Sequence, residues 1–268
     1  MLHSRMTSAF TGVEMDYRKA LRTAQSYAPA LKPAKDAFYR HARRILRRPH
    51  EPDFGILSAL RRDAAEVLVD VGANHGQSIE SMRLFQPKAP IVAFEANPRL
   101  ADILARRYAG QANVRIEGCG LGDSEGAFTL FVPSYRGFVY DGLASVDRDN
   151  AAGWLGPATI YGFDERQLVL QSVACKLATL DAFQLSPAFI KVDVQGLEFA
   201  VLGGARATIE RCRPALLIED FGSDPRIAPL VKSLGYDVFH VEGRTIVKGT
   251  GPRENTLLLP SDRPRFAM

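Results

Sequence analysis

The chain has 268 residues, of which 46% are hydrophobic and 24% charged, and these fractions lie near the averages of globular proteins. The composition excludes collagen, coiled coil and wholesale disorder, and the length suffices for one large domain with appendages. No apolar run approaches the ~18 residues that cross a bilayer, and the first thirty residues lack the hydrophobic core of a signal peptide, so we expect a cytoplasmic protein. The cysteines Cys119, Cys175 and Cys212 are too few and too scattered for a disulfide framework or a zinc site, and we expect buried thiols.

Charge is distributed unevenly along the chain. Residues 1–50 hold eleven Lys and Arg against three Asp and Glu, so they carry +8, whereas the remaining 218 residues sum to −4. The densest part, 40–48, predicts a helix that Pro49 ends, because proline lacks a backbone donor and disfavours helical geometry before it. We therefore predict a basic helical arm over residues 1–53. It could lie on an anionic membrane surface or pack as a solvated helix against the domain, and its lack of accompanying aromatic residues disfavours nucleic acid.

From residue 54 onward, strands alternate with helices. The segment 66–71 is a short β-branched apolar run, followed by a glycine turn at 72–77 and a helix from 78 to 85. A second strand is predicted at 91–95, with Asn97 as the N-cap of the next helix. Further strands are predicted at 114–118, 188–194, 215–218 and 236–240, and further helices near 177–184, 197–210 and 225–234. Because strands joined by helices form right-handed parallel units, we predict that residues 54–268 form a doubly wound, Rossmann-like α/β sheet with helices on both faces.

Acidic residues close most of the predicted strands. Open sheets of this kind bind ligands beyond the carboxyl ends of their strands, where this chain has Asp70, Glu95, Asp193, Glu219 and Asp220. The first strand is followed by Gly72-Ala73-Asn74-His75-Gly76-Gln77, a turn in which the backbone can approach a ligand and a helix begins with free N–H donors. Its Gly-x-x-x-Gly spacing, and the aspartate before it, disfavour a dinucleotide pyrophosphate and favour a cationic amino-acid headgroup.

Glu95 is a candidate for binding the ribose of the same ligand. It lies twenty-three residues after Gly72, where a carboxylate accepts hydrogen bonds from both hydroxyls of a ribose. An amino acid joined to an adenosine is S-adenosylmethionine. Asp123, in the turn after the third strand, is near enough to accept a hydrogen bond from the adenine amine, although a turn aspartate also caps its own backbone.

Four motifs carry a resemblance to a known family: VDVGANHGQ at 69–77, FEANP at 94–98, GDSEG at 122–126 and IKVDVQGLE at 190–198. Together they resemble the FkbM-type S-adenosylmethionine-dependent methyltransferases, over roughly residues 66–220. The resemblance implies a class I methyltransferase sheet, with Asp70, Gly72, Ala73, Asn74, Gly76 and Gln77 at the methionine end, Glu95 beside Ala96 at the ribose, and Gly122 with Asp123 at the adenine. Members with known substrates chiefly methylate hydroxyls of sugars or natural products. The family usually has Glu where this chain has Gln195.

Methyl transfer to a hydroxyl requires an aligned acceptor, exclusion of water, and a base or metal ion that activates the hydroxyl. Asp193 follows the strand expected beside the first one, and it is the leading candidate base. His75 in the glycine turn and Glu198 at the next helix start are the other catalytic candidates, although each also has a structural explanation. Asp193 with Glu219 and Asp220 offers hard oxygen ligands that suit Mg²⁺.

Residues 133–172 form an insertion that is too irregular for a helix and too long for a plain loop. A strand at 128–132 leads into it. Its aromatic residues are Tyr135, Phe138, Tyr140, Trp154, Tyr161 and Phe163. Because aromatic rings stack on the apolar faces of sugars, we predict that the insertion caps a small-molecule or glycan acceptor; packing within a homo-oligomer is the alternative.

Three other functions share some of these sequence features. A nicotinamide-dependent oxidoreductase expects a glycine-rich pyrophosphate turn that this chain lacks. A nucleic-acid methyltransferase would use the basic arm, but the Asn/Asp-Pro-Pro-Tyr signature of base methylation is absent, and Asp193-Val194-Gln195-Gly196 stands in its place. A noncatalytic S-adenosylmethionine-binding or assembly protein stays open because of Gln195.

Overall fold

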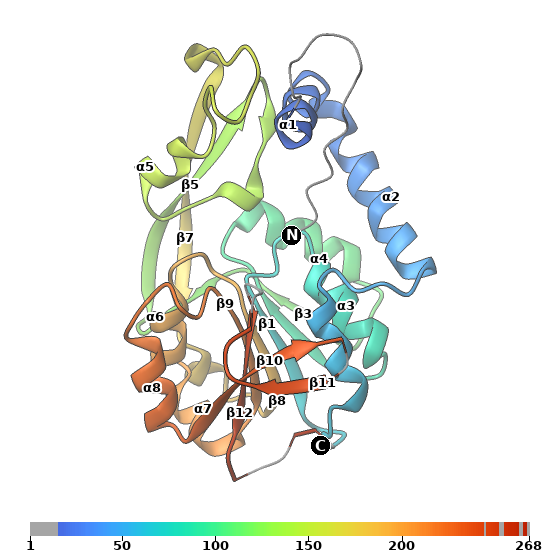
Figure 1. Ribbon diagram of the computed structural model, residues 1–268, viewed down its shortest axis with the longest axis vertical. Coiled ribbons are helices and arrows are strands. Elements are labelled where there is room, and N and C mark those ends of the chain that lie inside the picture. Colours follow the sequence, from blue (N-terminus) through green and yellow to red (C-terminus); the bar gives the residue numbers. More distant parts are fainter. Residues whose placement is uncertain (1–15, 244, 252–254, 263–264, 267–268) are drawn as a thin grey trace. The chain divides into compact units, whose positions relative to one another are not determined.

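The computed structural model describes residues 16–243, 245–251, 255–262 and 265–266 (Figure 1). Contacts divide the chain into two compact units: one holds the residues up to Phe38 with Thr129–Val173, and the other holds Tyr39–Phe128 with the residues from Ala174 onward. The predicted arm at 1–53 is thus divided between the units, and its residues 1–15 lie outside the described part. Among the described helices, none combines the length and the apolar character that crossing a membrane requires.

An eight-stranded sheet forms the centre of the larger unit, in the order β11-β10-β12-β9-β8-β1-β2-β3. Five neighbouring strands are parallel: β1 (Val67–Val71), β2 (Ile91–Phe94), β3 (Val114–Glu117), β8 (Pro187–Val192) and β9 (Ala215–Glu219). Three strands complete the sheet with antiparallel pairings: β10 (Tyr236–Glu242), β11 (Thr245–Lys248) and β12 (Asn255–Pro260). Among the five parallel strands, chain order runs outward from β1 in both directions, so the prediction of a doubly wound sheet is confirmed.

Each face of the sheet packs against its own helices, because alternate residues of a strand point to opposite faces. On one face, valines and isoleucines of β1, β8 and β9 pack with α6 (Glu198–Gly203), α7 (Arg206–Cys212) and α8 (Ile227–Ser233). On the other face, the intervening residues pack with α3 (Gln77–Phe85), α4 (Pro98–Tyr108) and the 3₁₀ segment η2 (Pro52–Ala59). Figure 1 shows these two layers on either side of the sheet. All three cysteines are buried, as predicted.

The predicted strands of the large sheet lie within two residues of their observed bounds, but one predicted helix is wrong and another is interrupted. The segment 177–184 is the end of β7 (Leu168–Ala178) followed by the short 3₁₀ helix η5 (Leu180–Phe183). The predicted helix at 197–210 is divided into α6 and α7. A Cβ atom at position 204 would lie 1.9 Å from the carbonyl oxygen of Gly122, so the chain approaches a neighbouring loop here through a glycine.

The smaller unit has an aromatic core of its own. Tyr135 and Phe163 stack with their ring centroids 5.1 Å apart, and Phe138 and Tyr140 are buried beside them. The surrounding elements are α1 (Tyr17–Tyr27), η1 (Pro29–Leu31), β6 (Phe138–Val139), η3 (Asp141–Leu143), α5 (Arg148–Gly153) and η4 (Glu165–Gln167). A second sheet has the order β4-β7-β5-β6, with β4 at Gly120–Leu121 and β5 at Gly126–Tyr135. Most rings of the predicted insertion therefore stabilise its own fold, whereas Trp154 stays 54% exposed.

The basic cluster at 40–48 belongs to a longer helix than predicted. Helix α2 spans Lys32–Ile45 and ends four residues before Pro49, and Arg47 follows it in a left-handed conformation with φ of 49°. The residues after the helix therefore turn away from its axis.

Arg265, near the end of the described chain, forms a buried ion pair with Glu66, which directly precedes β1. Its guanidinium is 2% exposed and donates to both carboxylate oxygens of Glu66, at 2.9 and 3.0 Å, and to the backbone oxygen of Arg213. We expect Arg265→Met to lower the free energy of unfolding by about 3–5 kcal/mol, because it leaves the Glu66 carboxylate buried without its cation. Urea denaturation measures this loss.

The matched control is Arg206→Gln, which breaks the exposed pair between Arg206 and Glu210 on α7. Its expected cost is about 0.5 kcal/mol or less. Equal losses in the two variants would contradict a structural role for the buried pair.

Candidate functional site

Polar side chains collect where the central parallel strands end. Asp70 lies near the end of β1, Lys191 is its neighbour in register on β8, and Glu219 ends β9. By the two-residue period of a strand, these side chains share the face of the sheet that α3, α4 and η2 cover. Asp193 follows β8 directly and hydrogen bonds to Glu219. The structure therefore brings together the acids that the sequence places at separate strand ends.

The glycine turn is held against the end of β8. Gly72 has a φ of 90°, and a Cβ atom there would lie 1.9 Å from the carbonyl oxygen of Asp193, so only glycine permits this approach. The backbone N–H groups of Gly72 and Ala73 both donate to the carbonyl oxygen of Phe94, each at 3.0 Å. Helix α3 starts directly after Gly76. The turn is thus fixed between β2 and β8.

Glu95 connects this turn to the next helix. Its Oε2 accepts from the backbone N–H of Asn74 at 2.6 Å, and its Oε1 accepts from that of Asn97 at 2.8 Å. The residue is 7% exposed. An ionised carboxylate has about four acceptor positions, so it can hold two backbone N–H groups and still accept from hydroxyls. Asn97 caps α4 as predicted, its side chain accepting from the Arg99 N–H.

Asp70 is a fully buried carboxyl whose two oxygens have no hydrogen-bond partner among the described residues. Burial, the largest effect, raises the pKa of Asp70 to about 8; the Lys191 cation opposes the rise, and the negative charges of Asp193 and Glu95 add to it. Asn74, at a φ of 46°, also has a buried side-chain oxygen without a partner. Buried polar atoms are normally satisfied, so these oxygens fit a donor-bearing, cationic ligand.

Asp193 and Glu219 share a proton. The hydrogen bond to Asp193 is the largest cause that raises the pKa of Glu219 to about 9, and burial and the negative charge of Asp193 add to it. Two close carboxylates cannot both ionise readily, so the pair holds one proton near neutral pH. Asp220 is exposed and has a φ of 50°. In the described part of the chain no three His, Cys, Asp or Glu side chains are placed to hold a metal ion, so the predicted Mg²⁺ site gains no support.

A second polar network, absent from the sequence-based prediction, adjoins this pair. The fully buried Lys191 donates to Oδ1 of Asn255 at 2.7 Å. The amide nitrogen of Asn255 donates in turn to Glu51 at 2.8 Å and to Asp53 at 3.2 Å. Lys191 is itself the sequence signal for this network, since a lysine inside a buried strand needs polar partners. The partners come from positions more than sixty residues away, and no local pattern marks them.

The other predicted site residues have varied surroundings. Glu198 is 2% exposed, and both its oxygens accept from the N–H of Gly196, at 3.1 and 3.0 Å, which fixes the loop that holds Gln195. His75 lies half-buried in the glycine turn, where its carbonyl oxygen accepts from Arg107. Ala96 is half-buried directly after Glu95. Gly122 is buried against α6 and Asp123 after it is exposed.

Asp70 predicts a specific dependence of stability on pH. The pKa of Asp70 is higher in the folded chain than in the unfolded chain. Its contribution to the free energy of unfolding is therefore complete below about pH 4 and is lost as the pH rises to about 8. Between these pH values, the carboxyl makes the free energy of unfolding fall by up to ~1.4 kcal/mol per pH unit, and we expect Asp70→Asn to remove this dependence. Urea denaturation at a series of pH values measures the slope.

Asp102→Asn, on the exposed side of α4, removes one carboxylate elsewhere and should keep the wild-type slope. If Asp70→Asn also keeps that slope, Asp70 is ionised in the folded chain at neutral pH.

Comparison with known proteins agrees with this geometry. The family model described as Methyltransferase FkbM domain matches residues 70–238, more than half of the chain. Similar solved structures include methyltransferase FkbM from Methylobacillus flagellatus KT, with 17% identity, a TM-score of 0.47 and coverage of 75% of this chain and 44% of that chain. This chain thus spans less than half the length of that protein.

Two further structures are similar at lower identity. Precorrin-6y C5,15-methyltransferase from Geobacter metallireducens GS-15 has 13% identity, a TM-score of 0.36 and coverage of 76% of this chain and 82% of that chain. An O-methyltransferase from Bacillus cereus in complex with SAH has 9% identity, a TM-score of 0.37 and coverage of 94% of both chains. No curated protein matches this chain in sequence. The match of the domain model over residues 70–238 shows that the chain belongs to the FkbM family of S-adenosylmethionine-dependent methyltransferases.

Proposed function

We propose that the chain transfers a methyl group from S-adenosylmethionine to a hydroxyl of a sugar, glycan or natural product. The observation that carries the proposal is the buried Asp70 carboxyl, which has no hydrogen-bond partner among the described residues and lies beside a glycine turn that Glu95 anchors. Together they offer an acceptor for a cationic amino acid next to an acceptor for ribose hydroxyls.

The residues present fit this cofactor. Asp70 and the side-chain oxygen of Asn74 would receive the methionine end, and Glu95 the ribose. Gly122 and Asp123 are proposed for the adenine edge. When bound, S-adenosylmethionine supplies an electrophilic methyl group on a sulfonium.

The Asp193–Glu219 pair is proposed as the base. The pKa of Glu219 is raised to about 9, so Glu219 can donate its proton in the hydrogen bond to Asp193, and the remaining acceptor positions of Asp193 can receive a hydrogen bond, and then the proton, from a hydroxyl. The Gly72 contact fixes the Asp193 backbone against the turn, so the base is positioned relative to the cofactor-binding residues. The insertion at 133–172 is still proposed as a cap over the acceptor, and Trp154 and Tyr161 are its exposed aromatic side chains among the described residues.

A noncatalytic cofactor-binding protein is the second candidate, favoured by one observation. Gln195 stands where the family usually has Glu, in an exposed loop with a φ of 53°. Cofactor binding without turnover of any hydroxyl acceptor would favour this reading.

Glu95→Gln tests cofactor binding. The amide places an N–H₂ group opposite a backbone N–H donor and removes the negative charge, so we expect affinity for S-adenosylhomocysteine to fall about tenfold or more. Isothermal titration calorimetry measures it. Glu125→Gln, in an exposed turn, is the control that should bind like the wild type. Unchanged affinity in Glu95→Gln would remove the ribose assignment.

Asp193→Asn tests the chemistry. Without the carboxylate the pair has no base, so kcat should fall about 10²- to 10⁴-fold while affinity for S-adenosylhomocysteine stays within about threefold. Mass spectrometry of a panel of glycosides and phosphorylated sugars, read as the gain of one methylene, supplies the assay. Asp220→Asn controls for charge at a neighbouring exposed position. Full turnover by Asp193→Asn would exclude it as the base.

A further inference from the structure

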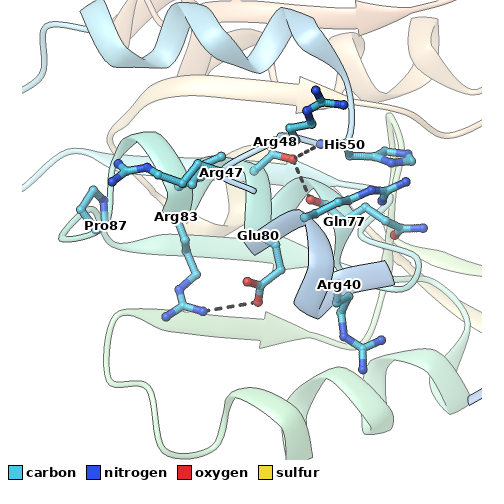
Figure 2. A pocket seen from close by; sticks show the side chains of 11 residues that line it. Arg40, Arg47, Arg48, His50, Gln77, Glu80, Arg83 and Pro87 are labelled. Atoms are coloured by element: carbon cyan, nitrogen blue, oxygen red, sulfur yellow. Dashed lines mark hydrogen bonds and ion pairs between the residues drawn. The ribbon is translucent and has the colours of Figure 1, made fainter. Parts of the chain in front are cut away.

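A basic pocket of about 260 Å³ lies on the larger unit, between the C-terminal half of α2 and helix α3 (Figure 2). Five arginines line it: Arg40, Arg43, Arg47, Arg48 and Arg83. The first four come from the basic cluster of the sequence, and Arg83 comes from α3. Figure 2 shows arginine side chains from both segments around the same space. Positive charges that are spread along the basic arm in the sequence are therefore gathered in one pocket by the fold.

The positive charge of the pocket exceeds its negative charge. Glu80 is the carboxylate in the lining, and it is engaged by Arg83 at 3.3 Å and by the Tyr108 hydroxyl at 2.7 Å. No carboxylate of the described residues forms an ion pair with Arg43, Arg47 or Arg48. The Nε of Arg83 is buried and has no acceptor there either. Donors with excess charge around a hollow indicate an anionic ligand.

The pocket adjoins the proposed methyl-transfer site. His50 lines it, and the next residue, Glu51, accepts from Asn255 and lies 3.9 Å from the Lys191 ammonium. Burial is the largest effect that lowers the pKa of His50, which leaves the arginines as the main positive charges of the lining. Gln77, the last residue of the glycine turn and the first of α3, lies in the wall as well. The pocket is thus connected through Glu51 to Lys191, whose charge acts on the Asp193–Glu219 pair.

The chemistry of the guanidinium groups indicates which class of ligand the pocket binds. Arginine forks match the oxygens of phosphate in paired hydrogen bonds, and several converging forks suit a group with more than one negative charge. Arg47 and Arg48 are exposed, but Arg40 and Arg43 are half-buried in the wall of a hollow, and converging cations of this kind suit a compact anion better than a flat membrane surface. We propose that this arginine pocket binds the phosphate or pyrophosphate group of a phosphorylated acceptor and so places its hydroxyl near Asp193 and Glu219. The identification of the ligand as the acceptor rests on the proposed function, but the anion site does not.

Titration with inorganic pyrophosphate tests the site. The double variant Arg43→Gln/Arg48→Gln should bind pyrophosphate at least about tenfold more weakly than the wild-type chain, because each lost guanidinium removes charged hydrogen bonds. The control Arg99→Gln/Arg106→Gln removes the same charge from exposed positions of α4 and should bind within about twofold of the wild type. Arg43→Lys/Arg48→Lys keeps the charge and loses the forks, so an intermediate affinity is expected even if the glutamine variant does not fold.

Turnover supplies an independent readout. Wild-type protein should methylate a phosphorylated sugar in preference to its dephosphorylated form, and the glutamine variant should raise KM for the phosphorylated form while kcat changes little. Equal use of both forms would overturn the acceptor assignment.

Other outcomes overturn the site itself. Absence of pyrophosphate binding at millimolar concentration, or equal binding by wild type and the glutamine variant, would do so. Displacement of pyrophosphate by saturating S-adenosylhomocysteine would assign the pocket to the cofactor instead. Binding to vesicles that contain phosphatidic acid, with no competition from pyrophosphate, would assign it to a lipid surface. S-adenosylhomocysteine binding is measured on the same samples: if it is intact while pyrophosphate fails to bind, this inference fails and the proposed function stands.

Discussion

The approach of Gly72 to the carbonyl oxygen of Asp193 is the contact on which the rest of the site depends. It leaves no room for a side chain, so it brings the turn after β1 against the residue that follows β8. Asp70 and Asn74 on one side, and the Asp193–Glu219 pair on the other, thereby belong to one rigid arrangement instead of two independent loops. Positioning of this kind lowers the barrier of a displacement reaction that needs its partners in line.

The second determinant is an imbalance of buried charge. Several carboxyls surround Lys191, which is the fully buried cation among them, and two of the carboxyls, Asp70 and Glu219, have strongly raised pKa values. Holding acids in this state costs stability that a cationic ligand at Asp70 would restore. The site thus follows a general pattern in which functional groups are less stable than the fold that supports them.

Much of this arrangement is readable in the sequence, because it depends on local signals. The β-branched run before Gly72, the Asn97 cap and the acids at strand ends each act within a few residues, and the doubly wound sheet follows from their alternation. The misses share a cause: they depend on contacts between distant segments. One predicted helix is divided at Gly204, where the chain lies against the backbone of Gly122. Lys191 contacts Glu51 and Asn255, which are distant in the sequence. Likewise the basic run at 40–48 predicts a helix, but its pocket also requires Arg83 and Gln77 of α3.

The place of β12 in the sheet has a consequence for how the chain acquires its structure. This strand follows β10 and β11 in the sequence, yet it lies between β9 and β10. A nascent chain that has emerged only as far as β11 therefore presents two strands whose facing edges lack their shared neighbour. Such edges are templates for pairing with other chains. The late insertion of β12 closes both at once, so the interval before it is when aggregation competes most strongly with folding.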